Sequence, residues 1–246
     1  MTSFVPLDKN VHAKTRVLTG RGEQFGENKH LVPIIADEVN NLALEYPICF
    51  IKNNATGQFG LQVMLGFEPE ENLFLEGENW QATYIPLHLL RQPFMVAVNA
   101  EEGTLPSADN TVITINMEST RVQQEQGEAL FDEQGNASPF LDNINHMLSN
   151  LVNGMVRTDK FIETLLAHQL IEEVHVNVTF EGEQPKRFEG IYTVSEKTLT
   201  ELDAKTLQQL NSKGYLQACY VILASMGNMQ KLIAKKRQRT ANSLTR

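Results

Sequence analysis

The sequence is poor in cysteine and tryptophan and has no long hydrophobic run. Among its 246 residues are two cysteines and one tryptophan. Cys49 and Cys219 each lie inside an apolar stretch, where cysteines behave as small buried hydrophobic residues. We therefore expect no disulfide framework and a reducing compartment. The longest apolar runs are under about ten residues, half of what a membrane-spanning helix needs, so no membrane span is expected.

The N-terminus also lacks the marks of a secretory signal. Residues 1–8 contain no basic region followed by an apolar stretch. We therefore expect a soluble chain that is made in the cytoplasm and located there. Export to the cell surface by a route that needs no N-terminal signal stays open as the alternative.

Positive charge is scarce as well, with 21 Lys and Arg against 30 Asp and Glu and a formal net charge of −9. The electrostatic field of a negatively charged protein repels the phosphate backbone of nucleic acids, so we expect no nucleic-acid partner. The chain nevertheless ends in a basic segment, which contains Lys231, Lys235, Lys236, Arg237, Arg239 and Arg246. Basic residues are favourable at a helix C-terminus, and this interpretation is preferred to a phosphate-binding patch.

The motifs of the common catalytic and cofactor sites are absent. The glycine-rich segment 20–26 has its third glycine one place too late for a dinucleotide fingerprint, and we interpret it as a flexible loop. Ser225 lacks the flanking residues of a nucleophile elbow, which favours a packing role. The six histidines stand singly, without the spacing of metal ligands: His12, His30, His88, His146, His168 and His175. The sequence therefore predicts neither a metal site nor a cofactor.

Hydrophobic spacing in the first half predicts one longer helix, a short helix-like stretch at 87–90 and two pairs of strands. Apolar residues recur at helical spacing between Pro33 and Tyr46, with Pro33 suited to a first turn. Residues 48–52 and 59–67 are predicted to form a hairpin around Gly57. Further strands are predicted at 95–99 and 112–117.

The second half is predicted to be mostly helical. Ser138 and Pro139 start a helical pattern of about 30 residues. Residues 174–180 then alternate between apolar and polar, which predicts a strand with one buried face, followed by a turn at 181–183. The remaining predicted elements are a partner strand at 186–194 and helices at 196–202, 204–213 and 216–237.

Paired strands with helices grouped between them indicate an α+β fold with antiparallel sheet. A long central helix and a C-terminal helical segment complete the prediction. The length suits one large domain or two small ones, and a single domain over residues 1–246 is preferred. The polar segment 120–137 is the alternative place for a boundary.

The segment 80–94 is the best candidate for a contact surface. Its residues Trp80, Tyr84, Arg91 and Phe94 include the types enriched in recognition hot spots, because each of those offers a large area together with a polar group. A protein or peptide partner would fit this composition. The alternative is that Trp80 and Phe94 belong to the core and that Arg91 pairs with a carboxylate.

The chain resembles the SapC family of bacterial proteins over nearly all of its length. The segments that carry the resemblance are Lys29–Pro33, Glu45–Phe50, Gly66–Phe67, Glu71–Phe74, Trp80, Tyr84–Pro86, Arg91–Phe94, Gly127–Asp132, Phe188–Val194, Gly214–Leu216 and Ser225–Asn228. The resemblance implies association with a bacterial surface layer; related proteins are often described near genes for outer-membrane receptors and flavin-halogenase-like enzymes.

Two positions depart from the family pattern. Leu90-Arg91-Gln92 stands where related proteins tend to carry paired arginines, and Ile222 stands where many have a histidine in the last helix. The second departure counts against any activity that depends on that histidine.

Three hypotheses about function remain. The preferred one is a non-catalytic accessory or binding protein of the bacterial envelope, surface layer or nutrient-uptake system. The second is a peptide- or protein-modifying enzyme, or the partner of a flavin or iron oxygenase, with a site that only the fold assembles; it would be favoured by convergence of His30, Tyr84, Arg91 or Glu128 in a deep polar pocket. The third is a structural subunit of a surface array. The sequence specifies neither a ligand nor an oligomeric state.

Overall fold

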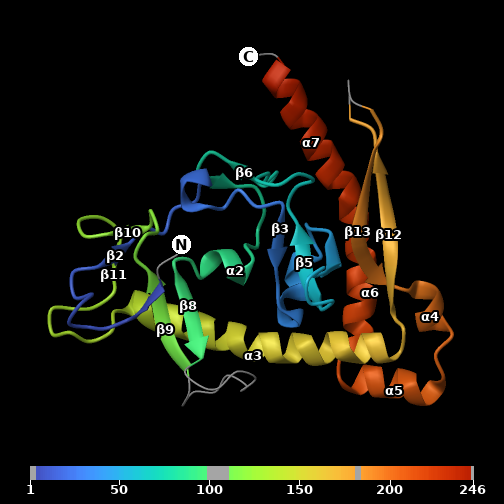
Figure 1. Ribbon diagram of the computed structural model, residues 1–246, viewed down its shortest axis with the longest axis horizontal. Helices are drawn as coiled ribbons and strands as arrows, with labels where there is room; N and C mark the ends of the chain where they lie inside the picture. Colours follow the sequence, from blue (N-terminus) through green and yellow to red (C-terminus); the bar gives the residue numbers. More distant parts are fainter. Residues whose placement is uncertain (1–3, 99–110, 181–183, 245–246) are drawn as a thin grey trace. The chain divides into compact units, whose positions relative to one another are not determined.

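The computed structural model describes residues 4–98, 111–180 and 184–244 (Figure 1). These residues form two compact units that are interleaved along the sequence. Unit 1 comprises Met1–Glu27, Leu75–Trp80 and Leu87–Val156, and unit 2 comprises Asn28–Phe74, Gln81–Pro86 and Arg157–Arg246. The segment 120–137 therefore lies wholly within unit 1. The predicted turn at 181–183, Asn99 of a predicted strand, Arg246 of the basic end and residues 1–3 lie outside the described residues.

The α+β prediction is confirmed. The strands are β1 (Phe4–Pro6), β2 (Arg16–Val17), β3 (Leu31–Pro33), β4 (Ile48–Lys52), β5 (Phe59–Met64), β6 (Leu75–Glu76), β7 (Asn79–Trp80), β8 (Phe94–Val98), β9 (Thr111–Asn116), β10 (Val122–Gln123), β11 (Glu128–Ala129), β12 (Ile171–Val178) and β13 (Lys186–Val194). The α-helices are α1 (Val39–Leu42), α2 (Leu87–Leu90), α3 (Pro139–Ala167), α4 (Glu196–Thr200), α5 (Ala204–Ser212), α6 (Tyr215–Ser225) and α7 (Met229–Leu244). Among the described residues, no helix combines the length and the apolar character needed to cross a membrane.

The core of unit 1 lies between a three-stranded sheet and the first part of α3. The sheet has the order β1-β9-β8, and its antiparallel pair β8–β9 confirms the two strands predicted at 95–99 and 112–117. Phe94 and Ile115 lie opposite each other and are fully buried with Leu141, Ile144 and Leu148 of α3. The long helix begins where Ser138 predicts, since the Ser138 hydroxyl accepts a hydrogen bond from the Leu141 amide at 3.2 Å.

Two short strands from the segment 120–137 flank β2, giving the order β10-β2-β11. The sequence did not predict these strands, because two-residue elements carry too little periodicity to be recognised. Gly127 has a φ of 97°, and a Cβ atom there would lie 2.5 Å from the Val17 carbonyl oxygen. Only glycine fits this close approach to β2.

The glycine-rich segment 20–26 contains a 3-10 turn at Glu23–Phe25 and wraps around a buried ion pair. Arg121 and Glu27 have side chains that are 1% and 0% exposed and lie 2.7 Å apart. Arg121 also donates hydrogen bonds to the carbonyl oxygens of Leu18 and Gly20, and its guanidinium lies 4.1 Å from the centre of the Phe25 ring. The second oxygen of Glu27 accepts the Gly22 amide at 3.0 Å. The conformation of this segment is therefore set by its hydrogen bonds to the buried side chains of Arg121 and Glu27.

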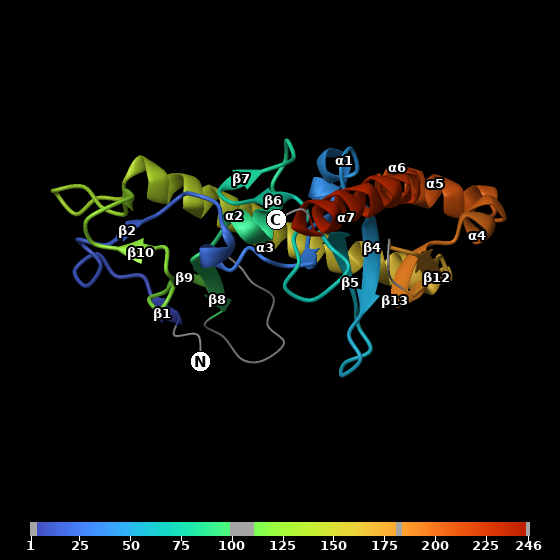
Figure 2. The same cartoon turned by 90° about the horizontal axis from the view of Figure 1, so that it is seen from above.

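Unit 2 contains a five-stranded antiparallel sheet with the order β12-β13-β4-β5-β3. The predicted hairpin of β4 and β5 is confirmed, although β5 ends at Met64, and its turn lies at the bottom of Figure 2. The predicted pairing of β12 with β13 is confirmed as well. On one face of the sheet, the ring centroids of Phe50 in β4 and Phe161 in α3 are 6.4 Å apart. The ring centroids of Phe161 and Tyr215 in α6 are 5.1 Å apart.

Two predicted helices are wrong in their extent. Residues 33–46 do not form one helix, because the Ile34 amide donates to the Leu61 carbonyl at 3.0 Å and Leu31–Pro33 joins the sheet as β3. Helical structure is confined there to a 3-10 turn at Ala36–Glu38 and to α1. The predicted helix at 216–237 is two helices, α6 and α7, separated by a 3-10 turn at Met226–Asn228.

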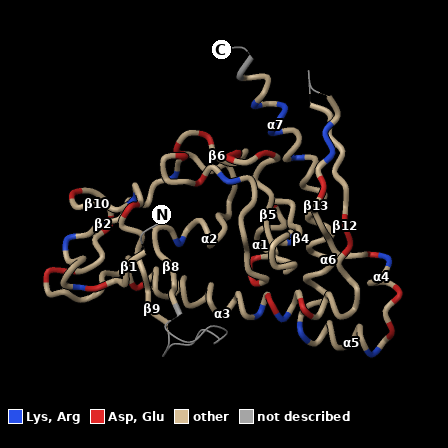
Figure 3. Tube along the Cα trace, viewed as in Figure 1, with Lys and Arg blue, Asp and Glu red and all other residues tan. Residues whose placement is uncertain are grey.

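The basic residues near the C-terminus lie along α7, where Figure 3 shows them in blue. Lys236 Nζ lies 2.5 Å from the Glu71 carboxylate, Lys235 Nζ lies 4.9 Å from the Phe74 ring centre, and Arg237 donates to the Thr179 carbonyl oxygen at 3.3 Å. These contacts join α7 to the rest of unit 2.

The buried ion pair of unit 1 generates a first prediction. Replacing Arg121 with Met should lower the free energy of unfolding by about 1–3 kcal/mol, because the carbonyl groups of Leu18 and Gly20 lose their donor. The buried Glu27 also loses one of its two arginine partners, although Arg21 still pairs with it at 2.6 Å. The matched control is Arg157→Met, since Arg157 forms a 3.1 Å pair with Asp37 whose side chains are 55% and 45% exposed. That change should cost less than about 1 kcal/mol. Urea denaturation measures both, and equal costs would contradict the assigned role of Arg121.

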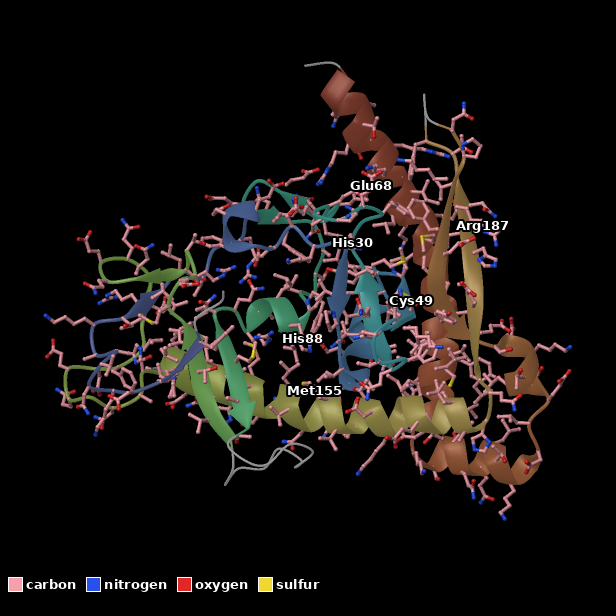
Figure 4. All side chains as sticks on the ribbon, in the orientation of Figure 1. His30, Cys49, Glu68, His88, Met155 and Arg187 are labelled. Atoms are coloured by element: carbon pink, nitrogen blue, oxygen red, sulfur yellow. The ribbon has the colours of Figure 1, made fainter. Side chains whose placement is uncertain are left out.

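A second prediction concerns His88 of α2, which Figure 4 labels. Burial, aided by the positive charge of Arg91, lowers the pKa of His88 to about 4. The unfolded chain therefore binds more protons below pH 6.5, so stability should fall as the pH drops toward 4, by on the order of 3 kcal/mol. His88→Gln should remove this loss, whereas His146→Gln at an exposed site of α3 should not. Urea midpoints between pH 7 and pH 4 test this, and parallel pH profiles for all three proteins would refute it.

Candidate functional site

The open face of the unit 2 sheet carries a groove of about 410 Å³. Cavities that bind small molecules have volumes of roughly 300–1,000 Å³, so this groove has the size of a ligand site. His30 and Arg187, both labelled in Figure 4, come from opposite ends of the β13-β4-β5-β3 part of the sheet. The lining residues are His30, Leu31, Ile51, Lys52, Asn54, Met64, Gly66, Phe67, Arg187, Phe188, Glu189, Gly190, Ile191 and Tyr192.

The floor of the groove is apolar and is built from pairs of neighbouring side chains. Leu31 lies opposite Met64 in the pairing of β3 with β5, and Ile51 lies opposite Ile191 in the pairing of β4 with β13. A third pair is formed by the rings of Phe67 and Phe188, whose centroids are 5.1 Å apart. Because successive strand residues point to opposite faces, Ile51 reaches the groove while Phe50 reaches the helical side.

The charged residues of the lining are two cations and one anion. Lys52 and Arg187 bring two positive charges to the rim of the groove, and Glu189 brings one negative charge that lies 2.8 Å from Arg187. Lys52 follows Ile51 on β4 and so lies on the Phe50 side of the strand, where its Nζ is 5.6 Å from the centre of the Phe59 ring. This last pair is exposed, with side chains 52% and 62% accessible, so water screens it strongly. The groove thus has an excess of positive charge on a chain whose net charge is −9. A ligand with an apolar body and a carboxylate would match such a lining.

His30 stands just before β3 and is the predicted site residue that lines the groove. Burial lowers the pKa of His30 below its ordinary value; the negative charge of Glu71 opposes this shift, and Lys29 adds to it. The imidazole is therefore neutral near pH 7 and can both donate and accept a hydrogen bond. Its backbone carbonyl accepts hydrogen bonds from the amides of Leu65 and Gly66, which fixes its position beside β5.

The turn after β5 holds one wall of the groove in place. The Glu71 carboxylate accepts the Phe67 amide at 2.8 Å and forms an ion pair with Lys236 of α7. A Cβ atom on Gly66 would lie 2.7 Å from the Glu71 carbonyl oxygen, so glycine is needed where the chain folds back on itself. Phe67, which is 6% exposed, is thereby fixed against Phe188.

The predicted contact segment 80–94 is divided between the two units. Trp80 lies in β7 of unit 1 and is half-buried. Phe94 is fully buried in the unit 1 core, so its ring does not reach the surface, as the core alternative for this residue anticipated. Arg91 donates a 2.6 Å hydrogen bond to the Phe94 carbonyl oxygen, and burial lowers its pKa. A partner contact through Trp80 stays a prediction.

Tyr84 and Glu128 are not among the residues that line the groove. Burial raises the pKa of Tyr84, and the charge of Glu38 and a hydrogen bond to it add to the shift. The backbone carbonyl of Tyr84 accepts the Tyr46 hydroxyl at 2.6 Å, which gives this segment a structural role in unit 2. Glu128 is exposed on β11 of unit 1. Of the four residues whose convergence would favour an enzyme, His30 alone lines the groove.

The two thiols are held in states of low reactivity. Both cysteines are buried, and burial raises the pKa of Cys49 and of Cys219 to about 12. A thiol with such a pKa is protonated at neutral pH and is a poor nucleophile. Among the residues that the structure describes, no three His, Cys, Asp or Glu side chains are grouped as metal ligands.

Ser225 and Asn228 join the C-terminal helices to the start of β4. The Ser225 hydroxyl donates to the Ile222 carbonyl oxygen at 2.6 Å and accepts the Ile48 amide at 3.0 Å. The Asn228 side-chain amide donates to the carbonyl oxygens of Ala43 and Tyr46. These bonds occupy the turn that separates α6 from α7, and they explain why the predicted single helix is interrupted. The packing role expected for Ser225 agrees with these contacts.

Sequence reasoning did not identify Lys52, Arg187 or Phe188 as site residues. Lys52 and Arg187 look like ordinary strand-end charges, and Phe188 looks like one member of an alternating strand. The signal that could have found them is the glycine at position 190, inside a run that otherwise reads as a strand. An isolated glycine within a strand pattern indicates a bulge or a close approach.

A third prediction tests the polar contacts of Asn228. Asn228→Ala should lower the free energy of unfolding by about 1–3 kcal/mol, because the buried carbonyl groups of Ala43 and Tyr46 lose their donor. The control is Asn211→Ala at an exposed position of α5, where a change within about 0.5 kcal/mol is expected. Thermal and urea unfolding measure the difference, and a neutral Asn228→Ala would show that these bonds contribute nothing.

The family comparison assigns the chain to one family. The SapC family model matches residues 7–232 of the 246-residue chain. Neither a curated protein nor a solved structure matches it. The match extends from the loop before β2 into α7 and so includes the strands and turns that form the groove. Since it covers far more than half of the sequence, this chain belongs to the SapC family.

Proposed function

We propose that this chain is a non-catalytic accessory or binding protein whose ligand occupies the groove of unit 2. The observation that carries the proposal is the groove itself, which combines an apolar floor with a neutral His30 and has Lys52 and Arg187 at its rim. Ligand sites of proteins are mostly apolar concavities with a few polar groups that orient the ligand.

The composition of the lining supports the same proposal. Three of the segments that carry the resemblance to SapC, around His30, Phe67 and Phe188, come together at this groove from distant parts of the sequence. Other such segments have structural explanations, as Gly127 beside β2 and Asn228 beside α1 illustrate. We further propose that the protein is located in the cytoplasm and that, by binding this ligand, it assists an envelope, surface-layer or nutrient-uptake system.

The test compares how much ligand is retained by the wild type and by a variant in which a larger side chain fills the groove. Leu31→Trp places a large ring on the groove floor, and Leu44→Trp makes the same change at a site that is 71% exposed in unit 2. Each purified protein is immobilised and exposed to an envelope extract of a bacterium that carries it, and the bound compounds are identified by mass spectrometry. The wild type and Leu44→Trp should retain the same compounds, and Leu31→Trp should retain at least tenfold less.

Circular dichroism must first establish that both tryptophan variants are folded. Equal retention by all three proteins, or by none, would refute the groove as the binding site. Conversion of the retained compound into a product would instead support the enzyme hypothesis. Ordered assembly that grows with protein concentration would support the array-subunit hypothesis.

A further inference from the structure

Strand β13 is paired along only part of one side. On its outer side it pairs with β12 from Lys186 to Val194. On the other side only Ile191 and Tyr192 pair with β4. The reason is that β4 ends at Lys52, where Asn53 begins a turn and its side-chain oxygen accepts the amides of Ala55 and Thr56. Within the described parts of the chain, the stretch Arg187–Gly190 therefore has no partner strand on the β4 side.

A β-bulge lies at the point where the pairing with β4 stops. Between the pairs Val174–Ile191 and Val176–Phe188, β13 has one residue more than β12. Gly190 takes up the extra residue with a φ of 73°, and its amide donates to the Glu173 carboxylate at 3.2 Å. Bulges of this kind need glycine and increase the local twist of the strand. The bulge thus determines the direction in which residues 187–190 of β13 run.

The unpaired stretch and the groove are one site. Arg187, Phe188, Glu189 and Gly190 all line the groove, together with Lys52 and Asn54 at the end of β4. An extended chain placed there would continue the sheet where a longer β4 would have run. Strand addition works in this way: main-chain hydrogen bonds supply affinity, and pockets for alternate side chains supply specificity. The apolar pairs around Met64 and Phe67 would form such a pocket.

The charges select among extended chains. Lys52 and Arg187 outnumber Glu189 in the lining, and the Arg187–Glu189 pair is exposed enough to be replaced by a stronger partner. A carboxylate beside a planar guanidinium forms strong, paired hydrogen bonds. An acidic peptide therefore complements the groove, whereas a basic peptide would meet like charge.

From these observations we infer that the groove binds an extended acidic peptide segment as an added strand on β13. This inference rests on the proposed function, because it names the ligand class of the same groove. The backbone of the peptide pairs with Arg187–Gly190, an apolar side chain enters the pocket at Phe67 and Phe188, and a carboxylate lies near Lys52 and Arg187.

The probe is a pool of fluorescent, end-blocked heptapeptides of alternating Val and Thr with Asp or Glu at the centre. A second pool has Lys at the centre, and a third is the acidic pool with backbone N-methylation at alternate residues. Fluorescence anisotropy should show that the wild type binds the acidic pool at least tenfold more tightly than either of the others. Hydrogen exchange of the amides within 187–190 should slow when the acidic pool is bound.

The charge assignment is tested by the double variant Lys52→Glu/Arg187→Glu. It should bind the acidic pool at least tenfold more weakly than the wild type. The matched control is Lys160→Glu/Lys205→Glu, which makes the same change of net charge at exposed helical positions of unit 2 and should bind as the wild type does. If both double variants bind the acidic pool equally weakly, the change in net charge alone explains the loss. That outcome would overturn the assignment of Lys52 and Arg187 to the peptide site.

Other outcomes also decide the matter. Unchanged binding of the N-methylated pool overturns strand addition, and equal binding of the Lys pool overturns the preference for acidic peptides. Failure of the wild type to bind the acidic pool overturns the inference as a whole. If Leu31→Trp still abolishes retention of a ligand from the envelope extract in that case, the proposed function stands and only its peptide ligand is wrong. If no ligand is retained either, both proposals fail.

Discussion

The arrangement of unit 2 depends on the opposite orientation of neighbouring side chains on β4. Phe50 turns toward Phe161 and closes one face of the sheet with α3, while Ile51 turns to the other face and forms the groove floor with Ile191. Burying the first face lowers the free energy of the fold by removing apolar area from water. The second face keeps part of its apolar area accessible, and a concave apolar surface of this kind is what a ligand can cover.

Polar contacts around this sheet hold the wall and the floor of the groove in place. Glu71 fixes the Gly66–Phe67 turn and is itself held by Lys236 of α7. Asn228 and Ser225 fix the chain that leads into β4 through its buried carbonyl and amide groups. Each of these side chains satisfies backbone groups that would otherwise be buried without partners, which costs about 1–3 kcal/mol for each group. The wall and the floor of the groove are therefore held by separate sets of bonds.

In unit 1 a buried ion pair, rather than a sheet, organises the polar loops. Its loop at residues 20–26 and the turn around Arg121 are too polar to be held by apolar packing, and the buried pair of Arg121 with Glu27 organises them. Removing one partner of a buried pair is costly, because the charge that stays in the interior loses part of its compensation. Gly22, with a φ of 147°, donates its amide to Glu27, and Gly127 lets the backbone approach β2 at Val17. The glycine-rich segment is thus a structural feature of unit 1.

The sequence by itself determined the α+β class, the long helix that starts at Ser138 and the hairpins, because local periodicity and capping signals fix such elements. It also indicated His30 as a candidate. Only the tertiary structure decided that Phe94 is core and that His30, Phe67 and Phe188 share one groove. It also decided that Pro33, the start of the predicted helix at 33–46, pairs within the sheet as the end of β3, so that helical structure begins only at Ala36. The physical reason is that these outcomes depend on pairing between strands far apart in the chain, and the spacing of residues along one segment does not encode which other segment will lie beside it.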